Sequence, residues 1–313
     1  MTAPHRIDTH QHIVPPHYAA WLAKHGLNAG GRAIPEWSAD SALELMEQAR
    51  ISTAILSVST PGAHLGDALE AREMARSLNE FTAEIARNHA SRFGFFATLT
   101  LPDVEGAIAE ARHALDHLGA DGVVLLANVG GVYLGDPAWD PLMAELNGRS
   151  AVVFVHPSSL PTPPVQGIAP FVADFLLDTS RAAINLARLR TFERFPDLKI
   201  ILSHAGGFVP FAAERMARAC SDDGENIAEG IARLRQFYFD VALSSSPYAL
   251  PSLLAFADPE RITYGSDWPF APTERSLHFA RLLDEFPLTD EQRSAIDYGN
   301  AAKLFPQHAT ALG

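Results

Sequence analysis

Residues 151–156 read AVVFVH and residues 122–127 read GVVLLA, two continuous apolar runs rich in β-branched side chains. Such runs are typical of parallel strands that helices cover on both faces. Six further short runs of strand-like sequence lie at 6–10, 53–57, 93–99, 199–204, 239–243 and 261–265. Longer stretches with helical spacing separate them. Eight strands alternating with helices predict an α/β fold of the closed (β/α)8 type, the TIM barrel.

The stretches between the strands support this prediction. Residues 38–50 begin with Ser38 as a plausible helix N-cap, and residues 105–118 carry apolar side chains at helical spacing. A doubly wound open sheet is the competing topology, but no glycine-rich phosphate turn follows the first strand. No break in composition divides the chain, so residues 1–313 are predicted to form a single domain. The Pro-rich stretch 158–170 is expected to be a loop.

The overall composition limits the class of protein. The chain has 313 residues and a formal charge of −13, which argues against a nucleic-acid partner or an anionic membrane surface. One cysteine, Cys220, excludes an internal disulfide framework and a cysteine-built metal site. The first residues lack the apolar core of a signal peptide, and no apolar run is long enough to span a membrane. A soluble, cytoplasmic protein is expected.

Five polar residues stand at or just after predicted strand ends. In residues 8–12, DTHQH, His10 and His12 are two apart, so on a strand both project to the same face. His156 closes the run 151–156, His204 lies in 201–207, ILSHAGG, and Asp267 lies in 264–270, YGSDWPF. In a barrel the carboxyl ends of the strands build the active site.

Three imidazoles and one carboxylate suit a single divalent metal ion with one position open for water or substrate. The nitrogen and oxygen donors favour Zn²⁺, with Mn²⁺ or iron as alternatives. A fourth histidine could then act as an acid or base, or orient a metal-bound water. Spacing alone leaves open which histidine that is. The competing interpretations are a histidine-rich N-terminal arm for His10 and His12, and a hydrogen-bonded core side chain for His156.

Four motifs, DTHQHIVPP (8–16), FVHP (154–157), ILSHAGG (201–207) and YGSDWPF (264–270), resemble the amidohydrolase superfamily. The order and spacing are most similar to the amidohydrolase 2 group, which is related to aminocarboxymuconate semialdehyde decarboxylase. The resemblance covers residues 6 to about 305. Further stretches, including 122–137, resemble bacterial proteins described as 6-methylsalicylate decarboxylase-like.

The resemblance implies roles for the five polar residues. It implies that His10, His12, His156 and Asp267 bind the metal, and that His204 is the catalytic base or orients water. Binuclear amidohydrolases carry a carboxylated lysine on the fourth strand, whereas residues 122–131 here contain no lysine. A mononuclear site is therefore implied. A homodimer or homotetramer is also expected from the family.

Three functions fit these residues. The first is non-oxidative decarboxylation of an aromatic or unsaturated carboxylic acid, with His204 or Asp267 protonating the ring carbon. The second is hydrolysis of a lactone, an amide or a ring-cleavage product through metal-bound hydroxide, with His204 as general base. The third is a metal-stabilised binding protein without catalysis. We rank them in that order.

A carboxylic acid substrate that enters a protein of charge −13 needs local positive charge. Candidate cations are Arg32 and Arg181, and Asp178 is a candidate partner that orients a histidine. Aromatic walls for a flat ring are predicted from the following residues: Tyr133, Phe171, Trp268 and Phe270. Cys220 is interpreted as a buried or incidental residue that is not a nucleophile.

Overall fold

The computed structural model describes residues 5–312, so the first four residues and the last one of the predicted domain lie outside it. Eight parallel strands form one sheet in the order β1-β2-β3-β4-β7-β8-β9-β10. Their bounds are β1 Arg6–His12, β2 Ile51–Ser57, β3 Phe93–Thr98, β4 Gly122–Leu126, β7 Val152–His156, β8 Lys199–Leu202, β9 Tyr238–Asp240 and β10 Ile262–Thr263.

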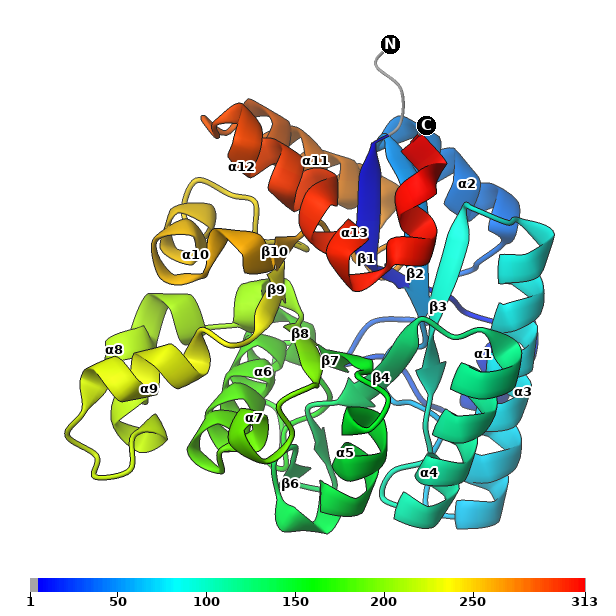
Figure 1. The fold of residues 1–313 in the computed structure, drawn as a ribbon. Coiled ribbons are helices and arrows are strands. Elements are labelled where there is room, and N and C mark those ends of the chain that lie inside the picture. Colours follow the sequence, from blue (N-terminus) through cyan, green and yellow to red (C-terminus); the bar gives the residue numbers. More distant parts are fainter. Residues whose placement is uncertain (1–4, 313) are drawn as a thin grey trace.

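The sheet closes on itself next to β10. Asp8 of β1 forms a parallel bridge with Tyr264, and the Thr9 amide donates to the Tyr264 carbonyl at 2.9 Å. The predicted (β/α)8 barrel is thus confirmed, with helices packed around its outside (Figure 1). The helices are α1 Pro16–Lys24, α2 Ala39–Gln48, α3 Ala68–Asn88, α4 Val104–His113, α5 Asp140–Asn147, α6 Pro170–Arg188, α7 Thr191–Arg194, α8 Val209–Cys220, α9 Ile227–Leu234, α10 Leu250–Phe256, α11 Thr273–Glu285, α12 Asp290–Ser294 and α13 Asn300–Leu304.

Local sequence signals explain several element ends. Ser38 caps α2, because its hydroxyl accepts from the Ser41 amide while the Ser41 hydroxyl accepts from the Ser38 amide. The segment 157–169 contains no helix or strand, as predicted for the Pro-rich loop. A short antiparallel hairpin, β5 Asn128–Val129 with β6 Val132–Tyr133, follows β4 and was not predicted.

The bounds of all eight strands differ from the prediction by one to three residues. β1 runs on to His12, whereas β8 ends at Leu202 and β9 ends at Asp240. His204 therefore does not close its strand but lies in the turn after it, with Ala205 at φ 56° and Gly206 at φ 71°. Left-handed backbone of this kind cannot continue a strand.

The inside of the barrel is filled below the mouth. Ile7, Ile55, Phe96, Phe154 and Ile201 are all buried there, together with Leu304 and Phe305 from the C-terminal segment. α13 lies beside β1, at the end of the barrel where the strands begin (Figure 1). Apolar side chains fill the barrel interior at this end, so the polar residues at the carboxyl ends of the strands lie above a packed hydrophobic core.

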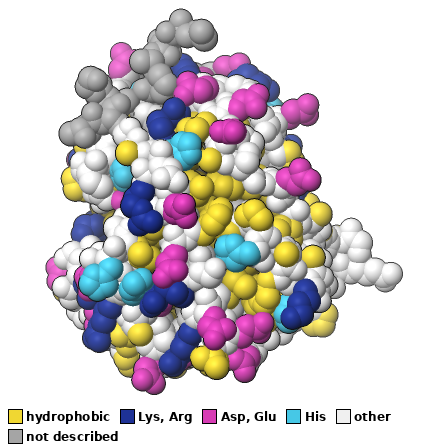
Figure 2. All heavy atoms as spheres, turned by 90° about the vertical axis from the view of Figure 1, so that its right-hand side faces the viewer, with side chains coloured by type: hydrophobic (Ala, Val, Ile, Leu, Met, Phe, Trp, Pro, Cys, Tyr) yellow, Lys and Arg dark blue, Asp and Glu magenta, His cyan; other side chains and the backbone are white. Residues whose placement is uncertain are grey.

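No helix among the described residues is long and apolar enough to cross a membrane. On the face that carries α3 and α4, acidic and basic side chains are interspersed with hydrophobic ones (Figure 2). Several of them pair between neighbouring helices, for example Arg76 with Glu110 at 2.9 Å and Arg72 with Asp103 at 2.6 Å.

Candidate metal centre

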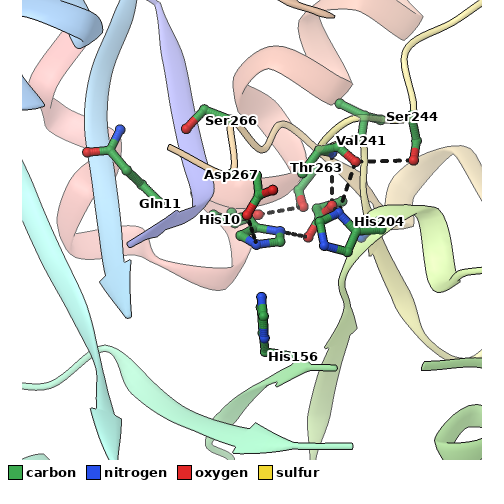
Figure 3. A network of polar contacts seen from close by, with 12 residues as sticks. His10, Gln11, His156, His204, Val241, Ser244, Thr263, Ser266 and Asp267 are labelled. Atoms are coloured by element: carbon green, nitrogen blue, oxygen red, sulfur yellow. Dashed lines mark hydrogen bonds and ion pairs between the residues drawn. The ribbon is translucent and has the colours of Figure 1, made fainter. Parts of the chain in front are cut away.

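Four polar side chains meet at the barrel mouth. His10 and His12 come from β1, His156 ends β7, and Asp267 follows β10. One donor atom of each lies within 4.8 Å of the donor atoms of the others, and all four side chains are buried. Figure 3 shows His10 beside Asp267, with His156 below them.

Hydrogen bonds fix the orientation of the three imidazoles. Nδ1 of His10 lies 2.8 Å from Oδ2 of Asp240, Nδ1 of His12 lies 3.2 Å from the Ser57 carbonyl, and Nδ1 of His156 lies 2.8 Å from the Pro157 carbonyl. Carboxylate and carbonyl oxygens only accept, so each Nδ1 carries the proton. The lone pairs of the Nε2 atoms are left for the common centre.

The distances between these atoms match a metal site. The Nε2 atoms of His10 and His12 are 3.1 Å apart, and Oδ1 of Asp267 is 3.3 Å from the first and 3.2 Å from the second. Two ligands of a tetrahedral zinc, each about 2.0–2.1 Å from the ion, lie about 3.3–3.4 Å apart. Three acceptor atoms this close require a positive charge between them, so the residues fit a divalent cation.

The pKa shifts of these side chains follow from the same arrangement. Burial by itself lowers the pKa of His10, but the Asp240 and Asp267 carboxylates outweigh it and raise that pKa to about 10. Burial lowers the pKa of His12 and holds that of His156 well below its usual value, so both imidazoles are neutral and ready to act as ligands.

His204 stands beside this cluster. Its ring centroid is 4.8 Å from that of His10, and its Nδ1 is 3.3 Å from the Ala242 carbonyl. Burial lowers the pKa of His204, which keeps the imidazole neutral. A neutral imidazole with one free nitrogen can accept a proton or, once protonated, return it.

The backbone at the mouth is strained. His204, Leu243 and Asp267 have φ of 53°, 53° and 58°, in the left-handed region that non-glycine residues avoid. Hydrogen bonds hold Asp267 in place, since its amide donates to the His10 carbonyl at 2.8 Å and its carbonyl accepts from Ala271 at 2.7 Å. Strain of this kind costs on the order of 1–3 kcal/mol per residue and clusters at functional sites.

A cavity of about 560 Å³ lies over the cluster. His156, His204 and Asp267 line it from below, and its walls are mainly apolar. Phe270 also packs on His12, with ring centroids 5.3 Å apart. Two cations reach this cavity, Arg32 and Arg275, and the Arg32 guanidinium lies 4.4 Å above the Phe171 ring.

The residues predicted as substrate contacts divide into two groups. Arg32, Phe171 and Phe270 line the cavity, whereas Tyr133, Arg181 and Trp268 lie outside its wall. Arg181 instead turns toward the β5–β6 hairpin, where its Nη1 is 3.4 Å from the Tyr133 hydroxyl. The Trp268 side chain is buried against α11, and its Nε1 donates to Thr273. Their placement does not support a contact with substrate.

Two polar roles differ from the sequence interpretation. Asp178, expected to orient a histidine, instead accepts hydrogen bonds from Asn128 and from the Ser158 amide, both at 2.8 Å. Asp240 orients His10 and was missed. Its signal was present, since it is the single charged residue in the apolar run 237–243, FYFDVAL. Arg275 was missed because the sequence of the helix that contains it gives no sign that this side chain reaches the cavity.

Comparison with known proteins agrees with the fold. Residues 7–307 match the Amidohydrolase family, and the chain belongs to this family. It is 36% identical to a 6-methylsalicylic acid decarboxylase of Penicillium expansum, over 96% of each chain.

Two solved structures are similar to this one. An amidohydrolase II from a structural genomics programme is 32% identical, with a TM-score of 0.91 over 96% of this chain and 99% of the other. A dihydroxybenzoic acid decarboxylase of Polaromonas sp. JS666, with bound manganese and 2-nitroresorcinol, has a TM-score of 0.80. It is 22% identical over 98% of this chain and 97% of the other, so that likeness concerns the fold.

Proposed function

We propose that this protein is a metal-dependent, non-oxidative decarboxylase of an aromatic carboxylic acid similar to 6-methylsalicylate. The observation that carries the proposal is the convergence of three Nε2 atoms and one carboxylate beneath an apolar cavity that two arginines reach. The similarity to a 6-methylsalicylic acid decarboxylase along nearly the whole chain supports the same reaction.

His10, His12, His156 and Asp267 would hold one divalent ion, since β4 offers no lysine to bridge a second. Zn²⁺ is our first choice because the donor set of three imidazoles and one carboxylate suits it. Mn²⁺ is the alternative to test, because it is bound in the Polaromonas decarboxylase. The bound ion would supply Lewis-acid chemistry toward the carboxylate and neighbouring hydroxyl of the substrate.

The side chains around the cavity would perform the remaining steps. Arg32 would attract the anionic substrate, and Phe171 and Phe270 would hold its ring. His204 or Asp267 would donate a proton to the ring carbon that bears the carboxylate. The C–C bond then breaks, its electron pair returns to the ring, and CO₂ leaves. One proton is consumed and one phenol is formed, with no oxidant.

The test is CO₂ release by metal-reconstituted protein from 6-methylsalicylate, salicylate, 2,6-dihydroxybenzoate and 5-carboxyvanillate. We expect release from at least one acid and none from Asp267→Asn, which should also bind metal more weakly. His204→Ala should keep the metal and lose at least 10²-fold in kcat. Loss of metal in His204→Ala would make His204 a ligand.

If none of the four acids releases CO₂ while one equivalent of metal is bound, the decarboxylase proposal is contradicted. Hydrolysis of lactones through the same ligands would then be tested next. A cytoplasmic location and a homodimer or homotetramer stay predictions, which fractionation and light scattering would check.

A further inference from the structure

A second cavity, of about 420 Å³, opens at the carboxyl ends of β2, β3, β4 and β7. Residues that are neighbours in the sequence line the two cavities. Ser59 and His156 line the first cavity, and Val58 and Ser158 line the second. The metal centre and the mechanism proposed above use no residue of this second cavity.

The lining of this cavity contains no Asp, Glu, Lys or Arg among the described residues, and His64 is its one titratable side chain. Leu99, Leu101, Leu126 and Val129 contribute apolar surface. A carboxylate would find no arginine or lysine here. Apolar cavities of about 150 Å³ already hold a benzene ring, so this volume is sufficient for a substituted one.

The hydroxyl of Thr98 offers this cavity a polar group. Thr98, at the end of β3, lines the cavity and is 4% exposed. Its backbone amide donates to Asn79 Oδ1 and its carbonyl accepts from Asn79 Nδ2, but among the described residues its hydroxyl forms no hydrogen bond. Because protein does not enclose this hydroxyl, a water or a ligand hydroxyl can form a hydrogen bond with it.

We infer that this second cavity binds a neutral monocyclic phenol, with the phenol hydroxyl on Thr98 and the ring against the leucines. Decarboxylation of a salicylate-type anion yields such a phenol, which has lost the charge that the first cavity recognises. The cavity is therefore a product site beside the metal centre. Its role as a product site rests on the proposed function, whereas phenol binding itself does not.

The test uses 3-methylphenol in calorimetric titrations of metal-loaded protein. We expect two sites in the wild type and one in Val129→Trp, because the indole fills the second cavity. The matched control is Val132→Trp, whose residue pairs with Val129 in the β5–β6 hairpin but does not line the cavity, and which should keep both sites. Thr98→Val should weaken the second site about fivefold.

Crystals soaked with 3-bromophenol would locate the second site through the bromine signal, expected next to Thr98. A single phenol site in the first cavity, or a second site that Val129→Trp leaves intact, would overturn the inference. These measurements need no turnover. Phenol binding without decarboxylation would contradict the proposed function and the role as a product site, but it would still support a phenol-binding site in the second cavity. If turnover is found, 3-methylphenol should show a noncompetitive component of inhibition that Val129→Trp lacks.

Discussion

Asp240 connects the metal centre to the residue proposed as acid or base. Its Oδ2 accepts from His10 Nδ1, and its Oδ1 accepts from the amides of His204 and Ala242, both at 2.9 Å. The carboxylate is fully buried, so water cannot replace any of these contacts. One side chain thus fixes the tautomer of a ligand and the backbone from which His204 projects.

Asp240→Asn should lower metal affinity 10- to 100-fold, the usual cost of losing a partner of a ligating histidine. The carboxamide of the asparagine keeps an oxygen that can accept from the backbone N–H groups of His204 and Ala242. Its NH₂ group, however, would face the Nδ1–H of His10, and two donors cannot form a hydrogen bond. Competition with a chromogenic chelator measures the affinity. The control is Asp258→Asn, a surface carboxylate that caps the Glu260 amide, which should bind metal like the wild type. Equal affinities in all three proteins would refute the role of Asp240.

At this scale the sequence predicted where the cluster lies but not how it is supported. The two-residue spacing of His10 and His12 on a strand is a local property, so their common direction could be predicted. The partner of His10 depends on which strand end lies opposite in the closed barrel, and 230 positions separate it from His10. Whether an aromatic side chain lines the cavity depends on the rotation of α6 for Phe171 and on the conformation of the turn after β10 for Trp268, and the sequence specifies neither.

Among the elements, strands were easier to predict than the ends of helices. Apolar runs marked all eight barrel strands, but α1, the β5–β6 hairpin and the short helices α12 and α13 were missed because each lacks a long periodic pattern. The helix predicted over 105–118 continues from α4 into a π-helical turn, Ala114–Leu118. Such a turn depends on packing that hydrophobic spacing does not encode.

The turn between α5 and β7 offers a stabilising substitution. Ser150 is exposed and has φ of 51°, a left-handed conformation in which glycine avoids the strain of a Cβ. Ser150→Gly should raise the free energy of unfolding by about 0.5–1 kcal/mol, the relief of strain less the entropy of the unfolded glycine. Urea denaturation would measure it. Ser221→Gly, where φ is −96°, should instead destabilise.

The contact between α4 and α5 has a defined pH dependence. Hydrogen bonds from Arg112 and Arg149 lower the pKa of Glu145 to about 2. Because the folded pKa is below the unfolded value of about 4.3, this carboxylate stabilises the fold above pH 4.3 and loses that effect as the pH falls toward 2.

Glu145→Gln should therefore lower the free energy of unfolding by about 1 kcal/mol at pH 7 and by less at pH 3. The value at pH 7 allows for solvent screening of the exposed Arg112. Urea midpoints of both proteins at the two pH values give the comparison. A difference that grew on acidification would contradict the assignment. Glu105→Gln, on the exposed first turn of α4, is the control.

For the whole molecule, the metal centre ties distant parts of the chain together. Its four side chains come from β1, from β7 and from the segment after β10, so a bound ion would cross-link both ends of the barrel sheet. An unfolded chain offers no such cluster. A ligand that binds only the folded state stabilises it by about 2.7 kcal/mol at a free concentration 100 times its Kd.

Removal of metal with a chelator should thus lower the Tm, and adding Zn²⁺ or Mn²⁺ back should restore it. Differential scanning calorimetry of chelated, reloaded and Asp267→Asn protein makes the comparison, with Asp267→Asn expected to respond weakly to metal. Identical Tm values for chelated and reloaded wild type would argue against a metal held by these four residues.

The closure of the barrel between Asp8 and Tyr264 also sets an order of events during synthesis. A ribosome releases His10 and His12 first, His156 later, and Asp267 last of the four. Until then β1 can pair with β2 on one side, while its other edge lacks the Tyr264 segment. The three imidazoles are thus synthesised before the last ligand, and a chain cut short before Tyr264 carries an open sheet edge that can pair with another chain.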